Sequence, residues 1–348
     1  MQDFIPLDEI DAAIVSALQI SPRASWTQLA RVLQMDSVTV ARRWKRLTDA
    51  GAAWVVGHPG PVLAASGAGC LAFIEVDCVN GRLLEAAEYL MRQPMVVGVE
   101  HVTGDRDLLV TVIAAGLGEL SRWVTGTLGS LSSVVAGRTH LAGTVHMHRS
   151  RWRLHALPTD RVERLAAAGS TRRGRTEPQL SGPDWDLVAA LSVDGRASYT
   201  ELAAACGLSI DTARRRTMQL IESGAVQLSC DLAAPLASRP VYVVLWVSVP
   251  ANGFTQAAQA IAGIRDVRMC VGITGRQNLM VMAWVQSAQD IQRFETRVAQ
   301  QAPGIEIVDR AVALSLMKLN GQLLDDNGYR RGAVPISPGG PASAPPLD

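Results

Sequence analysis

The sequence lacks an excess of charge, a long apolar run and a secretion signal, and each absence excludes a class of protein. The formal net charge is only +1 over 348 residues, so a surface that binds a polyanion has to be local. No apolar run reaches the roughly 18–20 residues that a membrane span needs. The acidic start MQDFIPLDEID is unlike a signal peptide. We therefore expect a cytoplasmic protein with no membrane partner.

Motifs of metal binding and catalysis are also missing. The sequence has no C-x-x-C pair, G-x-S-x-G, P-loop or H-E-x-x-H. His146 and His148 lie on one face of an expected strand, but no acid or cysteine at ligand spacing joins them, so a surface or interface role is favoured. We expect no catalytic residue, metal or cofactor. We also expect reduced, buried cysteines at Cys70, Cys78, Cys206, Cys230 and Cys270.

An internal repeat dominates what is present. Stretches of about 45 residues that start at Leu7 and Leu180 align without a gap. Arg23-Ala24-Ser25 falls on Arg196-Ala197-Ser198 in this alignment. Further on, HVTGDRDLLVTV (101–112) resembles GITGRQNLMVMA (272–283), and CLAFIEVD resembles VVLWVSVP. The sequence therefore predicts two tandem units of about 150 residues each.

The expected fold class is α+β, with a helix-turn-helix (winged) domain and a ferredoxin-like βαββαβ domain in each unit. A segment rich in Arg, Gly and Ser separates the units, and a Pro/Gly/Ala-rich end reads as disordered. The expected domains are a DNA reader at 1–60, a sensor and assembly domain at 68–150, a linker at 158–182, a second reader at 180–230, a second sensor at 240–322 and a tail at 331–348.

Helical periodicity and caps predict three helices at the start of each unit. Apolar residues recur at helical spacing over 7–20. Ser25 with Gln28 forms a capping box for a second helix, and Ser198 with Glu201 repeats it. A third helix begins after Asp36 and ends at Gly51.

The third helix has one apolar face and one polar, cationic face. Val40, Trp44 and Leu47 are expected to pack inward, whereas small polar residues and then arginines face outward, as a helix in the major groove requires. The alternative is a solvated basic helix, but its repetition in both units favours a reader. Asp211 predicts a weaker second reader. The expected DNA contacts are Ser37, Val38, Thr39, Arg42, Arg43 and Arg46, and Thr212, Arg215, Arg216 and Gln219 in the second copy.

The rest of each unit follows a strand–helix–strand–strand–helix–strand order. The first copy predicts strands at 70–77, 95–104, 107–115 and 132–148, with helices at 81–93 and 116–130. The second predicts strands at 241–249, 265–275, 278–286 and 304–319, with helices at 253–263 and 287–302. Amides at the Thr103-Gly104 turn can hold a carboxylate, and Asp105 or Asp107 an ammonium group. The alternative is a plain hairpin turn.

The chain resembles the Lrp/AsnC family over nearly its whole length. The residues that carry this resemblance are Leu7-Asp8, Asp11, Arg23-Ala24-Ser25, Leu29-Ala30 and Thr103-Gly104-Asp105-Arg106-Asp107, with Asp184, Gly195-Arg196, Gly207-Leu208-Ser209 and Thr274-Gly275 in the second copy. The resemblance implies sensor domains that pair through their sheets and bind amino acids or similar molecules near the glycine turn. The implied effector residues are Thr103, Gly104, Asp105, Asp107, Thr274, Gly275 and Asn278.

Three departures from the family pattern stand out. The chain carries two units instead of one, Met35-Asp36 replaces the usual turn, and Asn278 replaces the acid of Asp107. These departures predict an asymmetric or partly lost effector site. Two sensors on one chain are also expected to pair with each other at high effective concentration.

We therefore predict a sequence-specific DNA-binding transcription regulator that forms homo-oligomers through its sensors and responds to an amino-acid-like effector. The alternative is an enzyme similar to the sirohaem decarboxylases, which share this fold and imply a tetrapyrrole pocket with His and Arg. Two features oppose it: the segment HPGPVLAASGAG has no basic-aromatic run, and the arginine-rich third helix would be unexplained.

Overall fold

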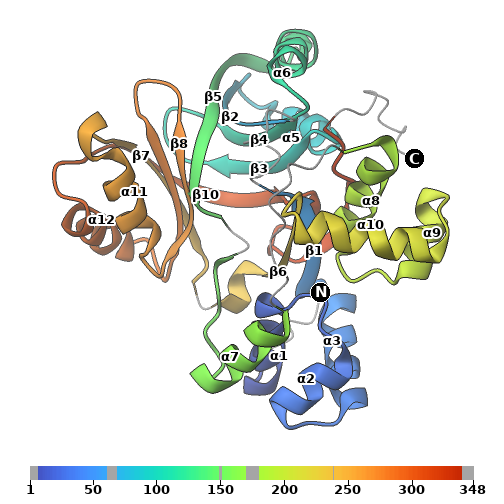
Figure 1. Ribbon diagram of the computed structural model, residues 1–348. Helices are drawn as coiled ribbons and strands as arrows, with labels where there is room; N and C mark the ends of the chain where they lie inside the picture. The colour runs from blue at the N-terminus through green and yellow to red at the C-terminus, as the bar shows by residue number, and fades with distance from the viewer. Residues whose placement is uncertain (1–6, 61–68, 149–150, 170–179, 238, 339–348) are drawn as a thin grey trace.

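A computed structural model describes residues 7–60, 69–148, 151–169, 180–237 and 239–338. Three helices and one strand open each unit (Figure 1). They are α1 (Glu9–Ile20), α2 (Trp26–Leu33), α3 (Ser37–Asp49) and β1 (Ala53–Pro59), and then α8 (Gly182–Val193), α9 (Tyr199–Cys206), α10 (Ile210–Glu222) and β6 (Val226–Leu232).

Local chemistry explains these helices. The Ser25 hydroxyl accepts from the Gln28 amide, and the Gln28 side chain accepts from the Ser25 amide, which completes the predicted capping box. The Asp36 carboxylate caps α3 by accepting from the amides of Val38 and Thr39. Gln34 takes the left-handed turn position before α3, where the second copy has Gly207.

The predicted wing takes another form in the described residues. β1 pairs antiparallel with β6, from Ala53 opposite Leu232 to Pro59 opposite Val226. Each strand after a third helix therefore finds its partner in the other unit, and no hairpin follows α3 within residues 7–60. This two-stranded ribbon joins the two readers.

The two sensor units have the predicted element order, with boundaries close to those expected. The first contains β2 (Cys70–Cys78), α5 (Leu83–Met91), β3 (Val96–Val102), β4 (Leu108–Ala114), α6 (Leu117–Arg122) and β5 (Val134–Met147). The second contains β7 (Val241–Ser248), α11 (Phe254–Ala262), β8 (Val267–Ile273), β9 (Leu279–Val285), α12 (Asp290–Gln301) and β10 (Glu306–Leu319). The helix expected over 116–130 is shorter, because a π turn over Trp123–Thr127 and a 3₁₀ turn over Leu128–Ser130 follow α6.

The last strand of each sensor crosses into the other sensor. Strands lie in the order β3-β4-β2-β5 in the first sensor and β8-β9-β7 with β10 in the second. β5 pairs with β2 up to Leu141 and then with β8 from Ala142, and β10 pairs with β7 up to Val312 and then with β3 from Ala313. The two sensors are thereby joined into one continuous sheet, with β5 and β10 between them (Figure 1).

The predicted linker and tail are both partly ordered. α7 (Thr159–Gly169) occupies the start of the linker and buries Leu165 in the same core as α1 and α2. β12 (Arg330–Ala333) pairs with β11 (Gln322–Leu324), so the expectation of disorder from 331 does not hold for 331–333. Apolar burial explains the order, because Ile336 is completely buried. The remaining tail, 339–348, lies outside the described residues.

The C-terminal hairpin of β11 and β12 contacts both readers. The amide of Arg330 donates to the carbonyl of Gly51 at 2.9 Å. The Gln322 side chain donates to the carbonyl of Ser192 in α8 at 2.5 Å. A side chain at Gly51 would place Cβ 2.2 Å from the Arg330 carbonyl oxygen, and the φ of Gly51 is +65°, so the contact requires glycine there. No helix in the described part of the chain has the length and apolarity to span a bilayer.

Candidate DNA interface and sensor cavity

The two third helices bury the faces that their sequences predict. Val40, Trp44 and Leu47 of α3 are buried against the first core. Ala213 and Leu220 of α10 do the same in the second reader. Figure 1 shows α3 beside α1 and α2, and α10 beside α8 and α9.

The outward faces carry only part of the expected set. Val38 is 71% exposed and Arg42 is exposed on α3. Arg215 and Gln219 are exposed on α10, as is Arg214. Ser37, Thr39 and Thr212 are half-buried near the helix starts, where Thr212 Oγ1 accepts from Ser209 Oγ at 2.8 Å.

Two of the predicted DNA-contacting arginines of α3 form ion pairs with acids of the first reader. Arg43 donates to Asp8 at 2.6 Å and to Asp11 at 3.0 Å, and Arg46 also pairs with Asp11. Asp11 is fully buried in α1, and a buried carboxylate is stable only with cationic or donor partners. These ion pairs therefore hold α3 against α1, and the DNA contacts expected of the two arginines stay a prediction.

The second reader repeats this ion pairing at Arg216. Its guanidinium donates to Asp184 at 2.8 Å and to the Ser181 hydroxyl at 3.0 Å. Burial raises the pKa of Asp184, but the hydrogen bonds from Ser181 and Arg216 outweigh this and leave that pKa below its ordinary value. The signal was present in the sequence, because the acid of helix one and the arginine of helix three recur together in both copies.

A reciprocal clamp between the readers was not foreseen. Arg23 donates to the carbonyls of Gly195 at 2.7 Å and Ala197 at 2.8 Å. Arg196 donates to the carbonyls of Pro22 at 2.5 Å and Ala24 at 3.0 Å. The guanidinium of Arg23 also lies 5.0 Å from the Tyr199 ring centre, and that of Arg196 lies 4.1 Å from the Trp26 ring centre. The repeated Arg-Ala-Ser motif thus fixes one reader on the other.

The glycine turns are attached to the crossing strands. The amide of Thr103 donates to the Val312 carbonyl, and the Val312 amide donates to Thr103 Oγ1, both at 2.9 Å. Thr274 makes the same pair of 2.9 Å bonds with Leu141. Both turns therefore link one sensor to the other, while Gly104, Asp105 and Gly275 are exposed.

Asp107 and Asn278 have one shared structural role. Asp107 Oδ2 accepts from the Cys78 amide at 2.6 Å. The Asn278 side chain accepts from the Val249 amide at 2.9 Å and donates to the Val249 carbonyl at 2.8 Å. Each side chain fastens the end of the first sensor strand, so the change from acid to amide preserves that function. A structural asymmetry between the two sensors has to come from other residues, and the asymmetry predicted for the effector site stays a prediction.

Such an asymmetry lies around Glu75, in the middle of β2. Glu75 is nearly buried and pairs with Arg106 at 3.2 Å, Arg138 at 3.1 Å and His140 at 3.1 Å. The hydrogen bond to Glu75 raises the pKa of His140. Trp246 occupies the position in β7 that corresponds to Glu75 in β2. The amide of Asp107 donates to the carbonyl of Val76, and the amide of Asn278 donates to the carbonyl of Val247. These two acceptors directly follow Glu75 and Trp246.

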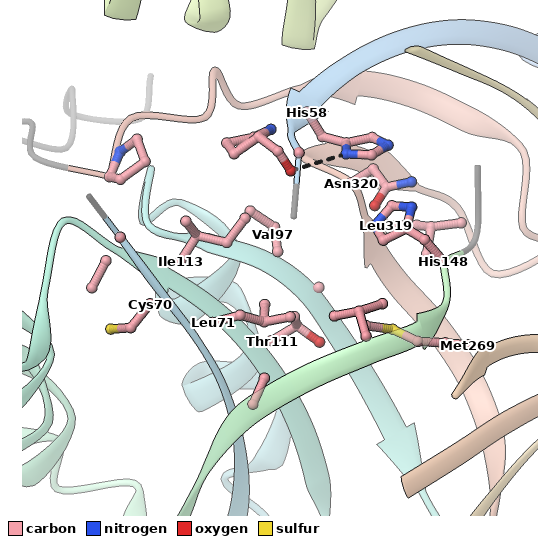
Figure 2. Close-up of a pocket in the computed structure, with 18 of the residues that line it drawn as sticks. His58, Cys70, Leu71, Val97, Thr111, Ile113, His148, Met269, Leu319 and Asn320 are labelled. Carbon is pink, nitrogen blue, oxygen red and sulfur yellow. Dashed lines mark hydrogen bonds between the residues drawn. The ribbon is translucent and has the colours of Figure 1, made fainter. Parts of the chain in front are cut away.

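A cavity opens on the side of the first sensor sheet that faces the readers (Figure 2). Its non-atom space amounts to about 920 Å³, with open solvent at the mouth included. Figure 2 shows His58 and His148 close together at one side, and Thr111 and Leu71 on the strands below. The ring centres of the two histidines are 4.6 Å apart. The lining comes from β1, β2, β3, β4, β5 and β10, from Trp185 of α8 and from Met269 of β8 in the second sensor.

Paired helix-turn-helix readers on joined sensor domains define a DNA-binding regulator with its own ligand-sensing part. The chain belongs to the Lrp/AsnC family. The AsnC-type helix-turn-helix domain matches residues 7–48 and 183–221, and the Lrp/AsnC ligand binding domain matches residues 71–150 and 242–323. Both family domains therefore occur twice.

Known proteins resemble either one unit or the whole tandem. The HTH-type transcriptional regulator FL11 of Pyrococcus horikoshii is 28% identical over 144 residues, which cover 41% of this chain and 93% of that protein. FL11 of Pyrococcus furiosus is 29% identical over 143 residues, or 40% of this chain and 91% of the relative. The solved structure of the siroheme decarboxylase NirDL with an iron-uroporphyrin III analogue covers 90% of this chain and 93% of its own, with a TM-score of 0.57 and 15% identity. That likeness shows a shared fold.

Proposed function

We propose that this regulator binds duplex DNA with both readers as one preassembled unit, through the outward faces of α3 and α10. The observation that carries the proposal is the fixed pairing of the readers within one chain, by the β1–β6 ribbon and the arginine clamp. A regulator with one unit per chain has to dimerise before two readers can act together. Here the pairing is intramolecular and does not depend on concentration.

The residues proposed to contact DNA are Arg42 with Val38 on α3, and Arg215 with Gln219 on α10. Arg42 and Arg215 are exposed, and no ion pair is recorded for either among the described residues. An exposed arginine one turn into such a helix reaches either a phosphate or a guanine edge. The two readers differ in these residues, so the preferred site is expected to be an imperfect palindrome.

The test begins with footprinting of the purified protein on genomic DNA, with its own promoter region first. Arg42→Ala and Arg215→Ala are each expected to weaken binding to the footprinted duplex and to reduce the slope of log K against log salt by about 1. Arg122→Ala, an exposed arginine on α6, is the matched control. Unchanged affinity and slope in both reader variants would contradict the proposed interface.

We further propose that an amino-acid-like effector acts at the exposed glycine turns, and that the sensors assemble into homo-oligomers. Support comes from the link between each turn and the opposite sensor through Thr103 and Thr274. Gly104 has a φ of +102°, so Gly104→Val strains the turn while its Cβ meets no atom closer than 3.8 Å. Calorimetric titration with amino acids is expected to show binding in the parent chain and none in this variant.

The order of strands within each sensor supports the finer assignment of ferredoxin-like domains, and the cytoplasm stays the expected location. A decarboxylase-like activity is the second candidate, because two histidines line a cavity in a fold shared with NirDL. A tetrapyrrole with several carboxylates needs cations, yet no Arg or Lys occurs among the described residues that line this cavity. Titrating iron-uroporphyrin III with the protein is expected to leave the absorption bands of the porphyrin unshifted, and a saturable shift would favour the enzyme.

A further inference from the structure

We propose that the second sensor carries a binding site for a small phosphorylated molecule, in a hollow beside Asp266 where arginines from separate segments of the chain meet. This site is distinct from the two glycine turns and from the cavity in the first sensor. Its ligand is either free phosphate or a small phosphate ester. Four observations carry the proposal.

The first observation is an excess of cations around one buried acid. Asp266 is 4% exposed and pairs with Arg239 before β7 and, at 2.5 Å, with Arg297 of α12. Its neighbour Arg265 is exposed and makes no ion pair within the described part of the chain. One carboxylate balances one guanidinium, so positive charge is left over at this place.

The second observation is that these cations repel one another. Burial, and then the charges of Arg265 and Arg297, lower the pKa of Arg239. Partial burial also lowers the pKa of His155, and the further causes are the charges of Arg265, Arg153 and Arg239. The arginines therefore lie close enough together to disfavour each other's charge. An anion placed among them would relieve this repulsion.

The third observation is a hollow at the same place. Its non-atom space amounts to about 710 Å³, with open solvent included. The lining consists of three arginines, two acids and the end of β9, namely Arg239, Arg293, Arg297, Asp266, Asp290, Val285 and Gln286. Asp290 is held by Arg293 at 2.9 Å and by the Ser287 hydroxyl at 2.7 Å, so both acids of the hollow already have cationic partners.

The arginines of the hollow keep donors for a ligand. A guanidinium has five N–H donors, and even a bidentate pair with a carboxylate uses two of them. A tetrahedral phosphate accepts from several directions and carries more charge than a planar carboxylate. Convergent arginines with unused donors therefore favour a phosphate over a single carboxylate.

The fourth observation is that the first sensor lacks this cluster. Met269 lies opposite Met282 in the same register that places Gly98 opposite Thr111. The same register puts Arg265-Asp266 where the first sensor has Pro94-Met95.

The backbone confirms this correspondence. The Trp284 amide donates to the Asp266 carbonyl at 3.0 Å, and the Ile113 amide donates to the Met95 carbonyl at 2.8 Å. The same turn thus forms around a methionine in one sensor and around an ion-paired acid in the other. Since the fold does not require the charge here, the acid and its arginines are a separate property of the second sensor.

The place of the hollow favours a small molecule over the DNA backbone. Figure 1 shows α12 on one side of the molecule and α8, α9 and α10 on the other. A duplex held on the outward face of α10 is therefore not expected to reach Arg293 and Arg297.

The segment around His155 connects the arginines with the first reader. The Leu154 amide donates to the Gln19 side chain at 2.7 Å, and the Ala156 amide donates to the Ser16 hydroxyl at 3.2 Å, both on α1. His155 lies between these two bonds and is the residue on which the arginines act. A ligand that neutralises the arginines is therefore expected to stabilise the contact between the second sensor and the first reader.

The test uses the full chain with inorganic phosphate and AMP as probes. Acetate and adenosine are the matched compounds without a phosphate, and NaCl holds the ionic strength constant. Phosphate and AMP are expected to raise Tm saturably and to bind in calorimetry, whereas acetate and adenosine do neither. AMP that binds more tightly than phosphate supports an ester as the ligand, and equal affinities support free phosphate.

Two variants distinguish a binding site from a structural cluster. Arg293 is exposed and pairs with Asp290 on its own helix, so Arg293→Gln is expected to weaken phosphate binding about 10-fold and to leave Tm without phosphate unchanged. Arg265→Gln is also expected to weaken phosphate binding, and to leave Tm without phosphate unchanged or higher, because a repulsion is removed. Arg122→Gln, on the exposed surface of α6, is the control.

Several results would overturn the proposal. They are the absence of saturable binding of phosphate and AMP, binding that survives both variants, an equal effect of acetate, and binding of duplex DNA alone through these arginines. Calorimetry with phosphate and AMP involves no DNA, so failure of the proposed DNA interface would leave this test intact.

Discussion

The reciprocal clamp predicts that replacing Arg23 and Arg196 with lysine loosens the paired readers without unfolding either one. Each guanidinium holds two carbonyl oxygens at 2.5–3.0 Å, and an ammonium group cannot reproduce this fork. Losing one charge-assisted bond at each arginine costs about 1.5 kcal/mol per site. Burial, and then the charge of Arg23, lowers the pKa of Arg196 to about 10. The two guanidinium groups therefore repel each other, and moving the charges apart in the lysine variant offsets part of the lost stability. We expect a net loss of about 2 kcal/mol.

Two measurements test this expectation. Equilibrium urea unfolding is expected to show the loss of stability, with the single variants non-additive because both side chains lie in one contact. Binding to a duplex with both half-sites is expected to weaken, whereas binding to one half-site and the salt slope stay unchanged, because neither arginine is placed on the DNA face. Arg122→Lys is the control. Two-site affinity equal to that of the parent chain would refute the role of the clamp in pairing the readers.

Three further outcomes follow from other contacts. Asp11→Asn leaves two arginines without their buried partner and is expected to lower the free energy of unfolding in urea by about 3 kcal/mol. Asp184→Asn frees only one arginine and is expected to cost less. Equal losses in the two variants would contradict this. His140→Ala is expected to lower the free energy of unfolding most below pH 6.5, and less as pH rises through the raised pKa of His140. The reason is that only the protonated ring is stabilised by the charge of Glu75. A loss of stability that grows with pH would refute this prediction. Gly51→Ala is expected to cost about 2 kcal/mol or more through its positive φ and the overlap with Arg330, and an unchanged Tm would rule out that contact.

Local rules were sufficient for the elements of the fold. Capping at Ser25 and Asp36 and the apolar, strand-favouring residues of β2 located helices and strands to within a few residues. These features depend on residues close in sequence, and the repeat allowed each to be read twice. The family membership follows from the same local patterns.

Long-range pairing is what the sequence did not reveal. Which strand β5 meets after Leu141 depends on the fold of the other unit, and so does the pairing of β1 with β6. The arginines of α3 looked like one cationic face, yet Arg43 reaches a carboxylate 32 positions earlier in the chain. The cavity was hidden for the same reason, because Gly98 and Thr111 are unremarkable until their counterparts Met269 and Met282 are seen in register.

The C-terminal hairpin changes where this protein can be cut. The match to the ligand binding domain ends at residue 323, so a chain shortened to that boundary would keep part of β11 and lose all of β12. It would also lose the bonds from Arg330 to Gly51 in the first reader and to Val193 in the second. A truncation chosen by homology alone would therefore remove one contact that the C-terminal hairpin shares with both DNA-binding domains.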